Sequence, residues 1–198
     1  MDDESSLTKS NETHLTSKVI EDSLSYDDQA TKKAISKNHI INAICLNLED
    51  IIQENKIYIN YIVKDIFYLT SIPEISLSDY INRIMKYTNI NISTLINAII
   101  YIDFFCERKK YILCLNNIYL ILLLACLLSI KFNEDVYVSS KLFAKIGGIP
   151  LENLNELESY LYLNLHFSLF VKDDLYKSYY DYFTNYLIPT KVKSEKNI

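Results

Sequence analysis

Glu158 is a carboxylate on a helical face that is otherwise built of leucine. The stripe has the three- and four-residue spacing of an amphipathic helix and comprises Leu151, Leu154, Leu161 and Leu165. Burying an unpaired carboxylate is costly or raises its pKa, so Glu158 needs a cation close by. That cation can belong to the same chain or to a bound partner, and the sequence leaves both possibilities open.

Lys131 raises the same question at the end of the most apolar stretch of the chain. Residues 118–130 carry no charge, which predicts a central helix buried on all sides, and Lys131 is the first charged side chain after them. The helix dipole favours a lysine in the last turn of a helix, which would explain Lys131 without any partner. The alternative is that Lys131, like Glu158, serves a contact.

Arg83 and Asp103 form a second candidate pair. Each lies in a helical stretch dominated by apolar side chains. A guanidinium beside a carboxylate is the usual way in which such charges are accommodated in a core. We therefore predict a structural salt bridge between Arg83 and Asp103.

The patterns typical of enzymes do not occur in this sequence. Its two glycines are adjacent, at 147–148, and no glycine-rich loop could hold a phosphate. The four cysteines lie in apolar stretches without C-x-x-C spacing, which predicts reduced core thiols, and the three histidines are too scattered for a metal site. We expect a protein that is not an enzyme, with no catalytic residue, no metal and no cofactor.

Composition and charge exclude further classes. The net charge of −5 and the presence of only two arginines argue against a nucleic-acid-binding groove. Two glycines and three prolines among 198 residues are too few for the turns of a sandwich or an α/β fold, which favours an all-α protein. The N-terminal sequence MDDESSLTKS is acidic where a signal peptide is basic and then apolar, so we expect a protein of the cytoplasm or nucleus that is not secreted.

Helical periodicity divides the chain into elements that would position these residues. Residues 1–38 lack the apolar content to join a core, so we expect a flexible acidic tail there. Residues 39–188 are expected to form the folded domain, and residues 189–198 a mobile basic end. Ser76 with Asp79 forms a capping box, Ser93 can cap another helix, and Ser139 or Ser140 can start a helix that ends at the two glycines. Helices are expected over residues 39–55, 76–86, 93–110, 118–130, 139–147, 150–165 and 171–189. Residues 57–74 show no clean period and are expected to connect the first two helices.

Four motifs occur in an order and spacing that resemble the cyclin box, and specifically the P-type or U-type (phosphate-regulatory) cyclins. They are Y-I-D at 101–103, K-F-N-E-D at 131–135, A-K-I-G-G-I at 144–149, and L-N-E-L-E at 154–158. The resemblance covers about residues 76–171. It implies a single five-helix cyclin box with an extra N-terminal helix and a C-terminal helical extension.

The resemblance also implies a function. A cyclin binds and activates a cyclin-dependent serine/threonine protein kinase, as a heterodimer with that kinase. Lys131 and Glu158 match the family's lysine–glutamate pair at the kinase interface, and Arg83 with Asp103 matches the family's internal bridge. The flanking apolar contacts of the family are matched by Phe132, Phe167 and Leu169.

Two departures and two alternatives accompany this interpretation. Phe104 stands where an arginine often follows Y-I-D, and the helix over 76–86 lacks the tryptophan-bearing substrate-docking pattern of cell-cycle cyclins. The first alternative is a cyclin-fold adaptor that binds a kinase or another protein without activating it. The second is a membrane-associated helical protein, which residues 118–130 suggest but are too short to support, since about 20 residues are needed to cross a bilayer. We therefore expect no membrane partner.

Overall fold

Helices make up all the regular structure in the part of the chain that the structure, a computed structural model, describes: residues 37–62, 64–135 and 138–186. The elements are α2 (Lys37–Glu54), the 3-10 helix η1 (Asn55–Tyr61), α3 (Leu77–Thr88), α4 (Ile92–Lys109), α5 (Ile118–Asn133), α6 (Ser140–Gly147), α7 (Leu151–Asn164) and α8 (Asp173–Asn185). The predicted all-α class is confirmed. Helices α3 to α7 are the five expected from the resemblance, with α2 before them and α8 after them.

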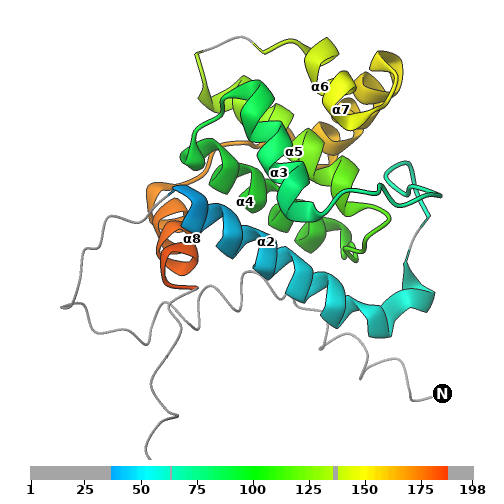
Figure 1. Cartoon of the computed structure of the whole chain (residues 1–198), viewed down its shortest axis with the longest axis horizontal. Coiled ribbons are helices and arrows are strands. Elements are labelled where there is room, and N and C mark those ends of the chain that lie inside the picture. Colours follow the sequence, from blue (N-terminus) through cyan, green and yellow to red (C-terminus); the bar gives the residue numbers. More distant parts are fainter. Residues whose placement is uncertain (1–36, 63, 136–137, 187–198) are drawn as a thin grey trace, which may run out of the picture.

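Helix α5 is the centre of the fold. Its first thirteen residues, 118–130, are all buried, as their uncharged sequence predicts. Helix α4 runs along α5, and α3, α6 and α7 also pack against α5 (Figure 1). The central helix is therefore covered on all sides, and the first residues that escape burial lie at its C-terminal end.

The two additional helices are part of the same core. Helix α2 packs against α3, α4 and α8, and α8 also packs against α4 (Figure 1). Asn47 Nδ2 on α2 donates a hydrogen bond of 2.9 Å to Tyr182 Oη on α8. Helix α2 begins at Lys37, two residues before the predicted start of the folded part. The remainder of the predicted acidic tail, the expected helix break at Pro189 and the predicted basic end lie outside the described residues.

Several helix ends follow the predicted capping chemistry. Ser76 Oγ accepts a hydrogen bond from the backbone N–H of Asp79, and Ser139 caps α6. Gly148 ends α6 with a φ of +66°, a conformation that glycine adopts without steric cost. The prediction that Ser93 caps a helix is wrong, because α4 already begins at Ile92 with Asn91 at its N-cap.

The connecting segment after α2 is more ordered than the sequence indicates. It opens with η1, and it is then anchored by Phe67, which is fully buried. The ring of Phe67 makes edge-to-face contacts with Phe105 and Tyr160, at centroid distances of 5.6 and 5.5 Å. This anchor joins the segment to α4 and α7, which carry residues of the candidate site.

Candidate functional site

Lys131 and Glu158 meet at the surface, where α5 ends beside α7. Lys131 Nζ donates to both carboxylate oxygens of Glu158, at 2.6 Å to Oε1 and 2.8 Å to Oε2. The side chain of Lys131 is 40% exposed and that of Glu158 is 15% exposed. The cation that Glu158 needs is therefore within the same chain, and the pair still faces solvent.

The sequence around the pair explains this position. Leu154, Leu161 and Leu165 on the leucine stripe are fully buried, and Glu158 lies at the edge of that stripe. Lys131 is the first exposed residue of α5. A surface ion pair of this kind contributes only about 0–1 kcal/mol to folding, so stability alone gives little reason for two charges at this place.

Two exposed aromatic side chains lie near the charged residues in the sequence, one at the end of α5 and one in the turn after α7. Phe132, which follows Lys131, is 52% exposed, and Phe167 is 61% exposed. The ring of Phe167 meets that of Tyr162 edge to face, with centroids 4.9 Å apart. Tyr162 lies one helical turn after Glu158 on α7, and Phe167, in the turn that follows α7, packs against Tyr162. Aromatic groups beside a few charges are typical of the residues that dominate protein interfaces.

Leu169 does not belong to this exposed surface, and its predicted role needs correction. It is 5% exposed, and its carbonyl oxygen accepts a hydrogen bond of 2.7 Å from the hydroxyl of Tyr101. Phe170, which sequence reasoning missed, is 70% exposed instead. Residues 168–172 are not helical, so neighbouring side chains in this segment can point to opposite sides. Helical spacing therefore cannot predict which of them is exposed.

The predicted bridge between Arg83 and Asp103 also needs correction, because the structure gives the two side chains different partners. Arg83 is exposed, and its Nη2 donates to the backbone carbonyl of Lys145 at a long 3.5 Å. Asp103 is buried, and its Oδ2 accepts a hydrogen bond of 2.6 Å from the hydroxyl of Tyr179 on α8. Burial and the neighbouring Asp103 carboxylate hold the pKa of Tyr179 well above its usual value, which keeps this donor protonated.

The four cysteines are free and buried, as predicted. Burial raises the pKa of the Cys45 thiol from 9.0 to about 11 and that of Cys126 to about 12. Thiols in this state are poor nucleophiles, since the thiolate is the reactive form. Within residues 37–62, 64–135 and 138–186, no three His, Cys, Asp or Glu side chains are grouped so that they could hold a metal ion.

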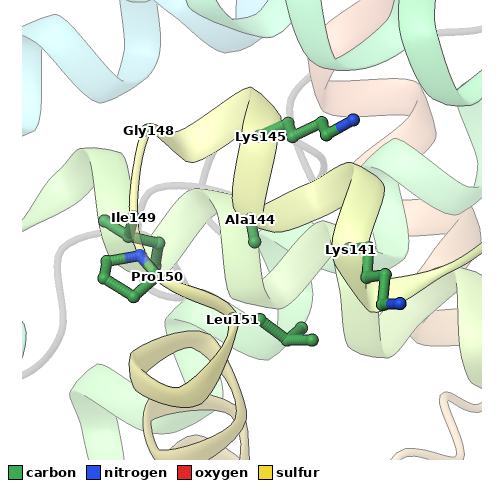
Figure 2. Close-up of a pocket in the computed structure, with 7 residues that line it drawn as sticks. All are labelled: Lys141, Ala144, Lys145, Gly148, Ile149, Pro150 and Leu151. Carbon is green, nitrogen blue, oxygen red and sulfur yellow. The ribbon is translucent and has the colours of Figure 1, made fainter.

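A hollow of about 610 Å³ lies where α6 turns into α7. Figure 2 shows Ala144 on α6 and Leu151 on α7 facing each other across it, with Pro150 nearby and the side chains of Lys141 and Lys145 extending from α6. Its only ionisable lining groups are the amines of Lys141 and Lys145, with no carboxylate, thiol or imidazole beside them, so the hollow has no paired acid and base.

None of the helices that the structure describes is both long enough and apolar enough to cross a membrane. Helix α5, the most apolar of them, is buried within the bundle.

Comparison with known proteins gives the same family that the motifs resemble. The family model for cyclins matches residues 6–169, which is more than half of the chain. Cyclin-U2-1 of Arabidopsis thaliana is 31% identical over 115 residues, which are 58% of this chain and 52% of that protein. PHO85 cyclin-like protein psl1 of Schizosaccharomyces pombe is 31% identical over 118 residues, 59% of this chain and 49% of that protein.

A third relative extends the match slightly. Cyclin-P3-1 of rice is 29% identical over 134 residues, covering 66% of this chain and 54% of that protein. The matched region thus spans about half the length of these relatives. The helical architecture, the ordered motifs and the family match agree, and the chain belongs to the cyclin family.

Proposed function

We propose that this chain is a regulatory subunit that binds and activates a cyclin-dependent protein kinase. The observation that carries the proposal is the surface pair of Lys131 and Glu158, with the exposed Phe132 next to Lys131 in the sequence, in a chain of the cyclin family. The kinase supplies the catalytic residues and the nucleotide site. The relative named PHO85 cyclin-like protein makes a PHO85-type kinase the first partner to test.

The charged pair can bind a partner without being broken. An ammonium group has three N–H donors, and Lys131 uses two of them on the oxygens of Glu158. The third donor and the remaining lone pairs of the carboxylate are available to a polar group of the kinase. Because the pair is already formed in the free chain, the two long side chains lose less rotational freedom on binding.

The aromatic side chains supply the apolar part of the proposed interface. Phe132 lies next to Lys131 in the sequence, and Phe167 contacts Tyr162, which lies one turn after Glu158 on α7. Phe170 joins this set because of its exposure, whereas Leu169 supports it from the core. A few aromatic anchors with a central charged pair are enough to account for most of the binding energy of an interface of standard size.

Activation follows from binding to one conformation of the kinase. A kinase whose αC helix is displaced lacks the Lys–Glu ion pair that positions the nucleotide phosphates. A cyclin that binds the ordered state more tightly shifts the population toward that state. A shift from 1:99 to 99:1 requires a difference in binding free energy of about 5.5 kcal/mol between the two states.

The test is to co-purify the chain with a PHO85-type kinase and to measure phosphorylation of a serine/threonine peptide by the complex. We expect the kinase to co-purify and its activity to rise well above that of the kinase alone. Phe132→Ala should reduce both, whereas Ile57→Ala, which removes an even more exposed apolar side chain from η1, should change neither. Binding without a rise in activity would support an adaptor instead, and absence of binding would contradict the proposal.

A further inference from the structure

The turn that carries Phe167 has an unfavourable backbone conformation. His166 and Phe167 have φ angles of +54° and +57°, in the left-handed region that residues with a Cβ rarely occupy. The ring of Phe167 is largely exposed, so its own burial does not compensate for this conformation. Contacts from the rest of the fold must therefore hold the turn.

One such contact comes from Arg108, near the C-terminal end of α4. From the sequence, Arg108 with Lys109 and Lys110 is a solvated helix end. In the structure Arg108 is exposed, as predicted, and its Nη1 also donates a hydrogen bond of 2.7 Å to the carbonyl oxygen of Leu165, the residue at which the turn begins. The guanidinium lies over the ring of Phe104, 5.3 Å from its centroid, which fixes the direction from which Arg108 approaches.

A second contact fixes the other end of the turn. The buried hydroxyl of Tyr101 donates to the carbonyl oxygen of Leu169 at 2.7 Å, and it accepts a hydrogen bond of 3.2 Å from Asn133 Nδ2. Asn133 is the last residue of α5 and follows Phe132 directly. Hydrogen bonds thus connect the end of α5, which carries one half of the candidate interface, to the turn that carries the other half.

We propose that Arg108 is a positioning residue that holds the turn from Leu165 to Leu169 so that Phe167 meets the kinase in one preset orientation. This inference rests on the proposed kinase-binding function. Arg108 acts through the backbone carbonyl of Leu165 and does not itself need to touch the kinase. If the preset orientation is populated for only a fraction of the time, the apparent affinity is the intrinsic affinity multiplied by that fraction.

The first test is a double-mutant cycle of binding to a PHO85-type kinase. Arg108→Ala should weaken binding about ten-fold in the wild-type chain, since the turn would then adopt the competent conformation only about a tenth of the time. In a Phe167→Ala background the same change should have less than a two-fold effect, because the turn then presents no ring. Lys109→Ala, at the neighbouring exposed position, should leave binding unchanged in both backgrounds.

The second test needs no kinase. Backbone N–H groups of Phe167 and Ser168 donate to the carbonyls of Tyr162 and Leu165, both at 3.1 Å. We expect Arg108→Ala to speed hydrogen exchange of these two amides in the free full-length chain at least five-fold, while exchange in the middle of α4 stays as in the wild type.

The outcomes separate the two proposals. An equal loss of affinity with and without the Phe167 ring, or unchanged exchange at Phe167 and Ser168, would overturn the positioning role of Arg108. If the wild type binds the kinase and Arg108→Ala binds equally well, only this role fails. If the wild-type chain binds no cyclin-dependent kinase, the proposed function fails, and the positioning role fails with it.

Discussion

Replacing Tyr179 with phenylalanine removes a hydroxyl that connects α8 to the buried carboxyl group of Asp103. Both side chains are at most 1% exposed, and the two oxygens are 2.6 Å apart. The substitution keeps the ring, so the packing of Tyr179 against Phe183 is preserved. The change therefore isolates the contribution of one hydrogen bond to a buried acidic group.

The expected loss follows from the burial of the acceptor. Leaving a buried acceptor without its donor costs about 1–3 kcal/mol, and water cannot easily replace this donor because the site is closed. We expect the free energy of unfolding to fall by about 2–3 kcal/mol. For a domain of this size each kcal/mol corresponds to about 2–4 °C, so Tm should fall by roughly 4–12 °C.

Urea denaturation followed by circular dichroism measures this loss, with thermal unfolding as a second readout. Tyr180→Phe is the matched control, because it makes the same chemical change at the neighbouring position, which is 37% exposed. The control should stay within about 0.5 kcal/mol of the wild type. A Tyr179→Phe variant as stable as this control would refute the assignment of Tyr179 as a structural partner of Asp103.

Three further predictions concern stability. Arg83→Ala should lower the free energy of unfolding by less than about 1 kcal/mol in urea denaturation, because the side chain is exposed. A loss of about 3–5 kcal/mol would instead support a buried salt bridge between Arg83 and Asp103. Gly147→Ala should cost about 1–3 kcal/mol by the same measurement, because the new Cβ would lie 2.4 Å from Leu123 Cδ2 in a packed core, and unchanged stability would show that Leu123 moves aside freely. The free energy of unfolding should fall as the pH rises from about 9 toward 11, because the thiols of the unfolded chain release protons that the folded chain retains. Urea titrations across this range should show a shallower decline for the double variant Cys45→Ala/Cys126→Ala. A decline equal to that of the wild type would assign the effect to other groups.

Local features of the fold could be predicted because they depend on residues close together in the sequence. The uncharged run 118–130 predicted a central buried helix, and Ser76, Ser139 and Gly148 predicted helix ends, since a cap needs only its neighbours. The cap of α4 was misplaced from Asn91 to Ser93 because two capping residues lie two positions apart, and local sequence does not decide between them.

Contacts between distant segments account for most of the corrections at the site. Two misplaced charges on apolar helices, Lys131 and Glu158, suggested a contact, and the structure pairs them with each other. The same reasoning failed for Asp103, because its partner is a neutral tyrosine on α8 and no charge pattern points to it. The role of Arg108 depends on where the turn after α7 places a backbone carbonyl, which side-chain spacing does not indicate.

Exchanging the two charges of the interface pair tests the central proposal most directly. Lys131→Glu/Glu158→Lys retains an ion pair within the chain but reverses the charges that a kinase would meet. We expect the exchanged variant to unfold within about 2 °C of the wild type, since the pair is a surface one. A change of Lys177 to Glu on α8 serves as the control for altered surface charge.

The decisive measurement is the Kd of the exchanged variant with a PHO85-type kinase, determined by isothermal titration calorimetry. The proposed interface predicts that affinity falls by at least about 2 kcal/mol, roughly thirty-fold, and that the restored internal pair does not recover it. Lys177→Glu should bind as the wild type does. Wild-type affinity in the exchanged variant would mean that Lys131 and Glu158 serve only each other, and it would contradict the assignment of this surface to the kinase.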